Sequence, residues 1–201
     1  YWTTSGLWVE HTASGLLIWR QDLACWHLYY AGSLNTVLDM VHSTKFETGS
    51  KPVVIDIVSK NPDETIIHGL NLCGFQKHTT LRRMLNTTPN CKAPVFFSSI
   101  RSATGTDIRD IAEIMNAVFD PLAEQIPTQD ELDAAVQSGK ILVNAIANKV
   151  LSFLYHEHIP AGSHLRFWAT HPLHQGTGAG SALLDRYLSS IPAKKYILWV
   201  V

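Results

Sequence analysis

The chain has few of the residues that mark several large classes of protein. Only 16% of its 201 residues are charged and the formal net charge is −1, so no strongly basic surface for nucleic acid is expected. No apolar run approaches the roughly 18 residues of a membrane-spanning helix, and no charged segment followed by an apolar one marks a secretory leader. These absences predict a soluble cytoplasmic protein with neither a nucleic-acid nor a membrane partner.

Cysteine is scarce as well. Cys25, Cys73 and Cys91 are widely spaced and odd in number, which favours reduced thiols over a disulfide framework. The apolar fraction is 46%, which is enough to bury a core, and the length suits one large domain or two small ones.

A glycine-rich segment follows a predicted strand at residues 164–170 and precedes a predicted helix. Its three glycines alternate with small residues, so successive backbone N–H groups can turn toward one point. The helix that begins near Gly178 adds unpaired amides and the positive end of its dipole, and Pro192 ends the helix. A strand, such a loop and a helix in succession predict an anion site that suits phosphate.

The loop resembles that of the GNAT superfamily of acyl-CoA-dependent N-acetyltransferases, whose signature is Arg/Gln-x-x-Gly-x-Gly/Ala. Gln175, Gly178 and Gly180 fill that pattern, and Thr170-His171-Pro172 matches the family's lead-in. The resemblance implies that the loop amides hold the pyrophosphate of acetyl-CoA, the co-substrate, and that the preceding strand receives the pantetheine arm. The coenzyme-binding residues that it implies are Trp168, Ala169, Thr170, Gln175, Gly176, Thr177, Gly178, Ala179, Gly180 and Ser181.

Two more kinds of nucleotide-binding loop are rich in glycine, and the chain matches neither. In a dinucleotide fingerprint read from Gly176 the third glycine would fall on Ser181, and residues 196–201 lack the expected acidic residue. No Gly-Lys-Ser/Thr triplet follows the glycines, which excludes a Walker loop. An ordinary helix-capping turn that binds nothing stays open.

The C-terminal half alternates strands and helices in the order β-α-α-β-β-β-α-β, the first two-thirds of the fold that the resemblance implies. A helix capped by Thr106 or Asp107 presents an apolar stripe, and a second helix begins with a capping box at Thr128 and Glu131. The expected stripe is Ile108, Ile111, Met115 and Val118, and strands are expected at residues 98–103, 141–147, 150–158, 164–170 and 196–201, with a tight turn at Asn148-Lys149.

The N-terminal half looks like a copy of the part that the C-terminal half lacks. Its strands are expected at residues 6–10, 15–20 and 24–30, followed by a helix and an apolar strand at 53–58 covered on both faces. The Gly74-Phe75 pair resembles the end of the family's closing helix. This half departs from the family, because it has only Ala31-Gly32-Ser33 in place of the phosphate loop and Leu70 where many members carry a tyrosine acid, so it is not expected to bind coenzyme A.

The fold class is therefore expected to be α/β (α+β), a mixed and mostly antiparallel twisted sheet flanked by helices. Two arrangements stay open. One is a tandem of a degenerate, partial half at residues 1–88 and an acetyl-CoA-binding domain at 95–201, joined by a linker around residues 89–94. The other is a single rearranged domain, in which N-terminal strands complete the C-terminal sheet.

The chain begins without methionine and stops at Val201 inside an apolar strand, so a fragment is expected, with the closing helix and two strands of the fold absent. An unpaired sheet edge near Val201 would favour a homodimer. The family's usual tyrosine acid would lie beyond Val201.

The expected enzyme is an N-acyltransferase that passes an acetyl group from acetyl-CoA to a primary amine by direct attack in a ternary complex. No cysteine lies near the loop, so no covalent intermediate is expected. The first candidate for the general base is His164, and the second is Glu157, which the two-residue period of a strand points away from His156 and His158. The acceptor, a small-molecule or peptide amine, would bind around residues 119–127.

Two alternatives accompany this expectation. His156 and His158 share a strand face and could ligate a metal, but no third ligand at suitable spacing follows, so no metal is expected. A catalytically silent acyl-CoA-binding or interaction module is the rival function, because no general acid can be assigned.

Overall fold

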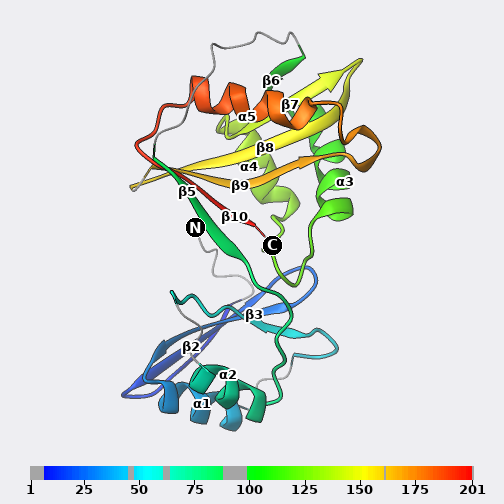
Figure 1. The fold of residues 1–201 in the computed structure, drawn as a ribbon. Coiled ribbons are helices and arrows are strands. Elements are labelled where there is room, and N and C mark those ends of the chain that lie inside the picture. Colours follow the sequence, from blue (N-terminus) through cyan, green and yellow to red (C-terminus); the bar gives the residue numbers. More distant parts are fainter. Residues whose placement is uncertain (1–6, 45–47, 61–63, 88–98, 161, 201) are drawn as a thin grey trace. The chain divides into compact units, whose positions relative to one another are not determined.

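A computed structural model describes residues 7–44, 48–60, 64–87, 99–160 and 162–200, and these form two compact units (Figure 1). Unit 1 comprises Tyr1–Thr79 and Pro121–Gln125, and unit 2 comprises Thr80–Asp120 and Ile126–Val201. The expected linker at residues 89–94, with Cys91, lies outside the described residues. No described helix is long and apolar enough to cross a membrane.

Unit 1 is a four-stranded sheet with helices against it. The strands follow one another in the order β1-β2-β3-β4, antiparallel except for the parallel pair β3 and β4. Their bounds are Leu7–His11, Gly15–Gln21, Trp26–Gly32 and Val53–Ile55. Helix α1 (Leu34–Ser43) packs on β2 and β3, and α2 (Glu64–Leu72) packs on α1. The core of this unit is Leu17, Trp19, Leu28, Val37, Met40 and Val41.

The predicted strands and first helix of this half are confirmed within two residues. The apolar strand expected over residues 53–58 is wrong in length and environment, because β4 ends at Ile55, its residues are only half-buried and Val58 is 76% exposed. An edge strand has a neighbour on one side only, so an apolar run does not by itself ensure burial.

Unit 2 is a six-stranded sheet in the order β5-β10-β9-β8-β7-β6. All neighbours are antiparallel except β9 and β10. The strands are β5 (Arg82–Asn86), β6 (Ile100–Ser102), β7 (Ile141–Ile146), β8 (Lys149–Ile159), β9 (Gly162–Thr170) and β10 (Tyr196–Val200). Helices α3 (Ile108–Val118), α4 (Gln129–Gln137) and α5 (Ala179–Ser190) flank it, with short 3₁₀ turns at Gly105–Asp107 (η1) and Pro172–His174 (η2).

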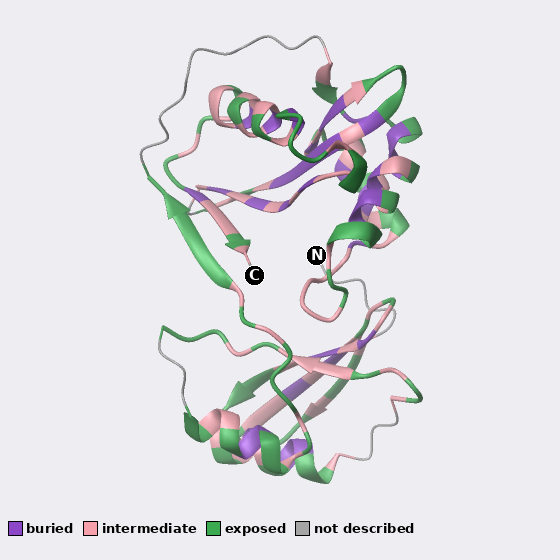
Figure 2. Ribbon diagram, turned by 45° about the vertical axis from the view of Figure 1, so that its right-hand side comes forward, coloured by how far each residue is buried: buried purple, intermediate pink, exposed green. Residues whose placement is uncertain are grey.

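Two apolar clusters fix the layers of unit 2. One joins α3 and α4 to one face of β7, β8 and β9, and the other joins α5 to the opposite face. Figure 2 shows the burial that results along β8 and β9. The first cluster includes Ile111, Ile114, Met115, Phe153 and Phe167, and the second includes Leu154, Leu165, Leu183, Tyr187 and Tyr196. The expected fold class is confirmed.

Two local expectations need correction, and a third is confirmed in position only. Asp107, one of the two predicted caps, is the N-cap of α3 but makes no side-chain cap hydrogen bond there. Its carboxylate instead accepts from the N–H of Thr104 at 2.7 Å, and Thr104 caps η1, through which the chain enters α3. The expected stripe of α3 includes Val118, which is 40% exposed, whereas Ile114 is buried. The turn between β7 and β8 sits at Ala147 and Asn148, one residue earlier than expected, since both have positive φ.

The sheet edge expected to stay open at the end of the chain is covered. Strand β10 pairs with β9 on one side and with β5 on the other, from Tyr196 opposite Asn86 to Val200 opposite Arg82. The expectation of an unpaired edge is wrong for this strand, because residues 82–86 from the first half of the sequence supply the missing neighbour. The single-domain arrangement required N-terminal strands to complete the C-terminal sheet. Strand β5 does so at one edge, although the chain still divides into two units.

Candidate acyl-CoA site

The glycine-rich loop has the geometry of an anion cradle. Gly176 and Gly178 have φ values of +77° and +83°, a left-handed conformation that side chains with a Cβ rarely adopt. A Cβ placed on either glycine would meet no atom within 4 Å, so the loop faces open space on that side. Gly178 is the N-cap of α5, and no side-chain cap accepts a hydrogen bond from the amides of the first turn. Its amides are therefore available to an anion, and the helix dipole favours one.

A pocket of about 340 Å³ opens above this loop. Most of the predicted coenzyme-binding residues line it, with two exceptions. Ala169 is buried in the core on the α3 and α4 side, and Thr177 donates its hydroxyl hydrogen to the His174 carbonyl at 2.7 Å. His174 lines the pocket and was missed by the sequence analysis. The lining residues are Trp168, Thr170, His174, Gln175, Gly176, Gly178, Ala179, Gly180 and Ser181.

The first turn of α5 is held against the sheet by its backbone carbonyls. The Trp168 indole donates to the Gly180 oxygen at 3.0 Å, and the Asn144 amide donates to the Ala179 oxygen at 3.4 Å. A Cβ on Gly180 would lie 2.7 Å from the Thr170 hydroxyl, so only glycine permits this approach. These contacts use the carbonyl oxygens of the turn and none of its N–H groups.

The equivalent turn of unit 1 differs in one decisive respect. Both units contain a strand, a helix and a parallel strand in succession, β3-α1-β4 in one and β9-α5-β10 in the other. The N-terminus of α1 is capped by Ser33, whose hydroxyl accepts from the Thr36 N–H at 3.3 Å. That cap occupies one of the amides that an anion would need.

The strand before the loop separates from its parallel neighbour. Strand β9 pairs with β10 only from Ser163 to Leu165, and β10 provides no partner for residues 166–170. The same stretch of β9 keeps its pairing with β8 on the other side. One backbone edge of β9 is therefore open directly before the phosphate loop, so an extended ligand could bond to it as a strand would.

The two candidate bases lie opposite each other. Glu157 on β8 and His164 on β9 are cross-strand partners, so their side chains share a sheet face. The sequence analysis named both without pairing them. His156 is buried on the opposite face against Tyr187, as the two-residue period predicted.

Two further residues complete this polar cluster. The Tyr155 hydroxyl donates to Glu157 at 3.1 Å, and Arg166 donates to the same carboxylate oxygen at 3.4 Å. The guanidinium of Arg166 also lies 5.5 Å from the Tyr155 ring centre. The sequence analysis missed both. The two-residue period from Glu157 could have identified Tyr155, whereas Arg166 sits at a register shift between β8 and β9 that the sequence does not signal.

Burial shifts the pKa values of two residues in this cluster. It lowers the pKa of His164, with the nearby Arg166 charge adding to the effect. Burial and the Glu157 charge raise the pKa of the Tyr155 hydroxyl to about 12. A histidine with a lowered pKa is neutral at pH 7 and can accept a proton, whereas a tyrosine of such high pKa keeps its own.

Of the two histidines considered for a metal, His156 is buried in the core and His158 is exposed. His156 is 4% exposed, neither ring nitrogen has a hydrogen-bond partner, and the ring centres of His156 and His158 lie 5.9 Å apart. Burial lowers the pKa of His156 to about 4, so this ring is neutral. Across the described ranges, no third metal-ligating side chain joins these two.

Comparison with known proteins gives structural matches to the fold but no sequence matches. Neither models of known families nor curated protein sequences match the chain. A GCN5-related N-acetyltransferase from Sphaerobacter thermophilus matches in structure with a TM-score of 0.58 at 14% identity, over 93% of this chain and 71% of that one. A Drosophila protein matches with a TM-score of 0.57 at 12% identity, over 93% and 65%.

Several other matches cover less of both chains. An N-acetylglutamate synthase from Neisseria gonorrhoeae, complexed with coenzyme A and N-acetyl-glutamate, matches at 17% identity with a TM-score of 0.42, over 46% of this chain and 22% of that one. For the first four matching structures, the aligned part covers between 22% and 63% of the neighbour's length. At these identities the likeness shows the fold, and the chain has the fold of the GCN5-related N-acetyltransferases.

Proposed function

We propose that this chain binds acetyl-CoA at the loop between β9 and α5 and transfers the acetyl group to a primary amine. The observation that carries the proposal is the uncapped N-terminus of α5, which opens into a pocket lined by Gly176, Gly178 and Ser181. Pyrophosphate fits this site because the loop offers backbone donors, a positive dipole end and no Cβ in the way.

The open edge of β9 supports a place for the rest of the co-substrate. A pantetheine arm is extended and carries two amides, so it can bond to the strand edge along residues 166–170. This path leads from the phosphate loop toward the Glu157 and His164 pair. The family resemblance implies that backbone amides of this strand, near Trp168 and Thr170, polarise the thioester carbonyl.

The chemistry then requires only positioning and proton transfer. The amine nitrogen attacks the thioester carbonyl carbon, its proton passes to the base, and the carbon–sulfur bond breaks to release the thiolate. We assign the role of base to His164 first, because its lowered pKa leaves it unprotonated, and to Glu157 second. Their shared sheet face allows one of them to act directly and the other to orient it.

Calorimetric titration with acetyl-CoA tests the site. We expect saturable binding by the chain, weaker binding of dephospho-CoA, and loss of binding in Gly178→Val, since a β-branched residue both resists the left-handed turn and blocks the phosphate. Gly139→Val is the matched control, because Gly139 has φ +65° and equally open surroundings in the same unit. Unchanged affinity in a folded Gly178→Val chain would exclude the anion site.

An assay of acetyl transfer to amines distinguishes the enzyme from the rival function, a catalytically silent acyl-CoA-binding module. Binding without transfer to any of a panel of amines would favour it. Transfer that falls at least tenfold in His164→Gln or Glu157→Gln would favour the enzyme.

A further inference from the structure

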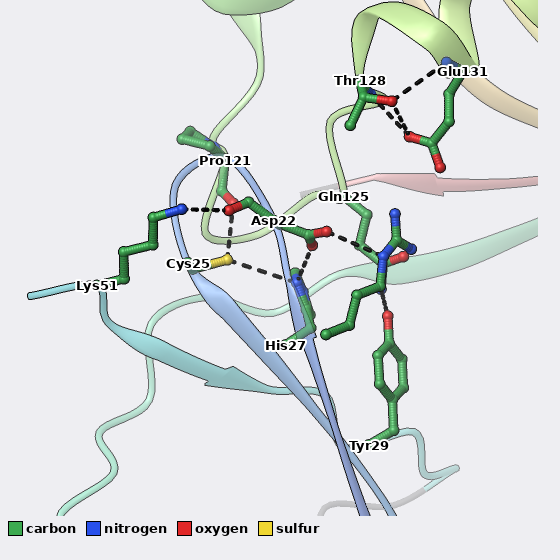
Figure 3. Close-up of polar contacts among 10 residues, drawn as sticks. Asp22, Cys25, His27, Tyr29, Lys51, Pro121, Gln125, Thr128 and Glu131 are labelled. Atoms are coloured by element: carbon green, nitrogen blue, oxygen red, sulfur yellow. Dashed lines mark hydrogen bonds and ion pairs between the residues drawn. The ribbon is translucent and has the colours of Figure 1, made fainter. Parts of the chain in front are cut away.

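Three side chains of metal-ligating types converge in unit 1 (Figure 3). Asp22 and Cys25 belong to the turn between β2 and β3, which the Asp22 N–H closes by donating to the Cys25 carbonyl at 2.9 Å. His27 follows on β3, two residues after Cys25 and on the same strand face. Their ligand atoms all lie within 4.8 Å of one another. In the part of the chain that the structure describes, this is the one group of three such residues that meets this distance.

The cluster is enclosed. Cys25 is fully buried, His27 is 2% exposed, and the side chain of Asp22 is 11% exposed. Three ionisable side chains in such a place need a reason, because burying them costs free energy unless they are paired or bind a cation.

A nucleophilic triad does not account for the arrangement. In a triad the histidine bonds to the acid through one ring nitrogen and to the nucleophile through the other. Here the Asp22 carboxylate lies 2.6 Å from His27 Nδ1, and the Cys25 sulfur lies 3.6 Å from that same nitrogen.

We propose that Asp22, Cys25 and His27 form a zinc-binding site. Zinc–sulfur and zinc–nitrogen bonds of about 2.3 Å and 2.0–2.1 Å at a tetrahedral angle place the two ligand atoms about 3.5 Å apart. The observed 3.6 Å between Cys25 Sγ and His27 Nδ1 fits that edge. The Asp22 oxygen, which now shares a hydrogen bond with Nδ1, moves outward by under about 1 Å when a cation replaces the proton.

The donor set favours zinc over other abundant divalent cations. One sulfur, one imidazole nitrogen and one carboxylate oxygen suit a borderline-soft ion, whereas magnesium and calcium prefer oxygen alone. The Pro121 carbonyl oxygen lies 3.8 Å from Cys25 Sγ and is the candidate for a fourth ligand. Zinc bound in this way would tie the Pro121–Gln125 segment of unit 1 to the β2–β3 turn.

Neighbouring residues hold the three ligands in place. Arg20 pairs with the other oxygen of Asp22 at 3.2 Å and so leaves Oδ2 for the metal, while Lys51 donates to the Asp22 backbone carbonyl at 2.8 Å. The His27 ring stacks on Tyr29, whose hydroxyl accepts from Gln125 at 2.6 Å. Oriented ligands of this kind are typical of metal sites, since outer contacts fix each ligand's geometry.

The experiment is zinc titration of the purified, metal-stripped chain, with bound metal measured by mass spectrometry and by competition with a chromophoric chelator. We expect one equivalent of zinc for the wild-type chain, an increase in melting temperature with zinc, and a thiolate-to-metal absorption band when cobalt replaces zinc. Magnesium should produce none of these changes.

The variants locate the site. Cys25→Ser and His27→Gln should lose the bound equivalent, whereas Cys73→Ser, which removes the other described free cysteine of unit 1, should keep it. A folded wild-type chain that takes up no zinc would overturn the proposal without any variant. Retention of zinc and of the cobalt band in Cys25→Ser would overturn it equally.

Discussion

At the scale of single residues, the environment of each side chain decides what a sequence pattern can mean. Glu157 and His164 were both recognisable as candidate bases, and the two-residue period correctly separated Glu157 from His156. The register between β8 and β9 decides that Glu157 lies opposite His164. It also decides that Arg166 lies beside them. Register is set by contacts between segments far apart in the chain, so no local pattern contains it.

The first residue-scale prediction concerns the pH dependence of transfer. A base whose pKa lies below the usual value for histidine, about 6.5, is protonated only in acid, so kcat/KM should rise with pH and level off below neutrality. In His164→Gln that acid limb should disappear and kcat/KM should fall at least tenfold, or about 1.4 kcal/mol. Steady-state rates measured from pH 5 to 8 check this, with His11→Gln as the control.

If His164→Gln keeps the acid limb and Glu157→Gln removes it, the order of the two candidate bases is reversed. If neither variant slows transfer, both assignments are wrong.

The second residue-scale prediction concerns Asp107, which is 3% exposed and accepts two hydrogen bonds from Arg101, at 2.6 and 2.9 Å. The Arg101 guanidinium lowers the pKa of this carboxyl to about 2. A lowered carboxyl pKa stabilises the fold above about pH 4, and the contribution is lost as the pH falls toward 2. Asp107→Asn should therefore lower the free energy of unfolding by about 2 kcal/mol at pH 7 and by much less near pH 2.

Urea unfolding followed by circular dichroism at the two pH values measures this difference. Asp185→Asn, at an exposed position on α5, is the control and should change little at either pH. An equal loss of unfolding free energy at both pH values would show that Asp107 stabilises the fold by packing and not by its charge.

At the scale of elements, short local signals were reliable where the partner atoms are close in sequence. The capping box at Thr128 is confirmed, with the Thr128 N–H donating to Glu131 at 2.8 Å. The sequence offered Thr106 or Asp107 as the cap of α3, and Asp107 occupies that position without a side-chain cap hydrogen bond, because Arg101 and the Thr104 N–H hold its carboxylate. The partner that holds the Asp107 carboxylate, Arg101, comes from the neighbouring strand β6.

We therefore expect Thr128→Ala to lower the free energy of unfolding by about 1 kcal/mol, because it leaves the Glu131 N–H without its side-chain acceptor. Thr106→Ala, at the other of the two caps that the sequence offered, should cost no more than a few tenths of a kcal/mol. Equilibrium denaturation of both variants makes the comparison. Equal losses would mean that Thr106 stabilises the start of α3 as well.

At the scale of the whole molecule, the first half of the sequence contributes a strand to the sheet of unit 2. Strand β5 runs antiparallel to β10 over five residue pairs and lies in unit 2, which begins at Thr80. The sequence favoured a boundary near residue 88 because prolines follow there, and that placement would assign β5 to the other half. Sheet pairing between distant segments carries no local composition signal.

A pair of shortened chains tests this division. A chain of residues 80–201 keeps β5, so it should fold and stay monomeric, whereas residues 95–201 lack β5, expose the edge of β10 and should aggregate or melt at a lower temperature. Size-exclusion chromatography and thermal melts compare them. Equal stability of the two would show that β5 is dispensable for the sheet.

The sequence by itself determined the order of the helices and strands, the glycine-rich loop after β9, the helix that starts at its last residues and the identity of the candidate bases. Each depends on neighbours within a few residues, where backbone preference, hydrophobic period and capping chemistry act. The tertiary structure decided which strand covers β10, where β9 leaves its partner, which helix terminus is free for an anion, and that Asp22, Cys25 and His27 meet. These depend on packing and strand register between distant segments, which are settled only when the whole chain has buried its apolar surface.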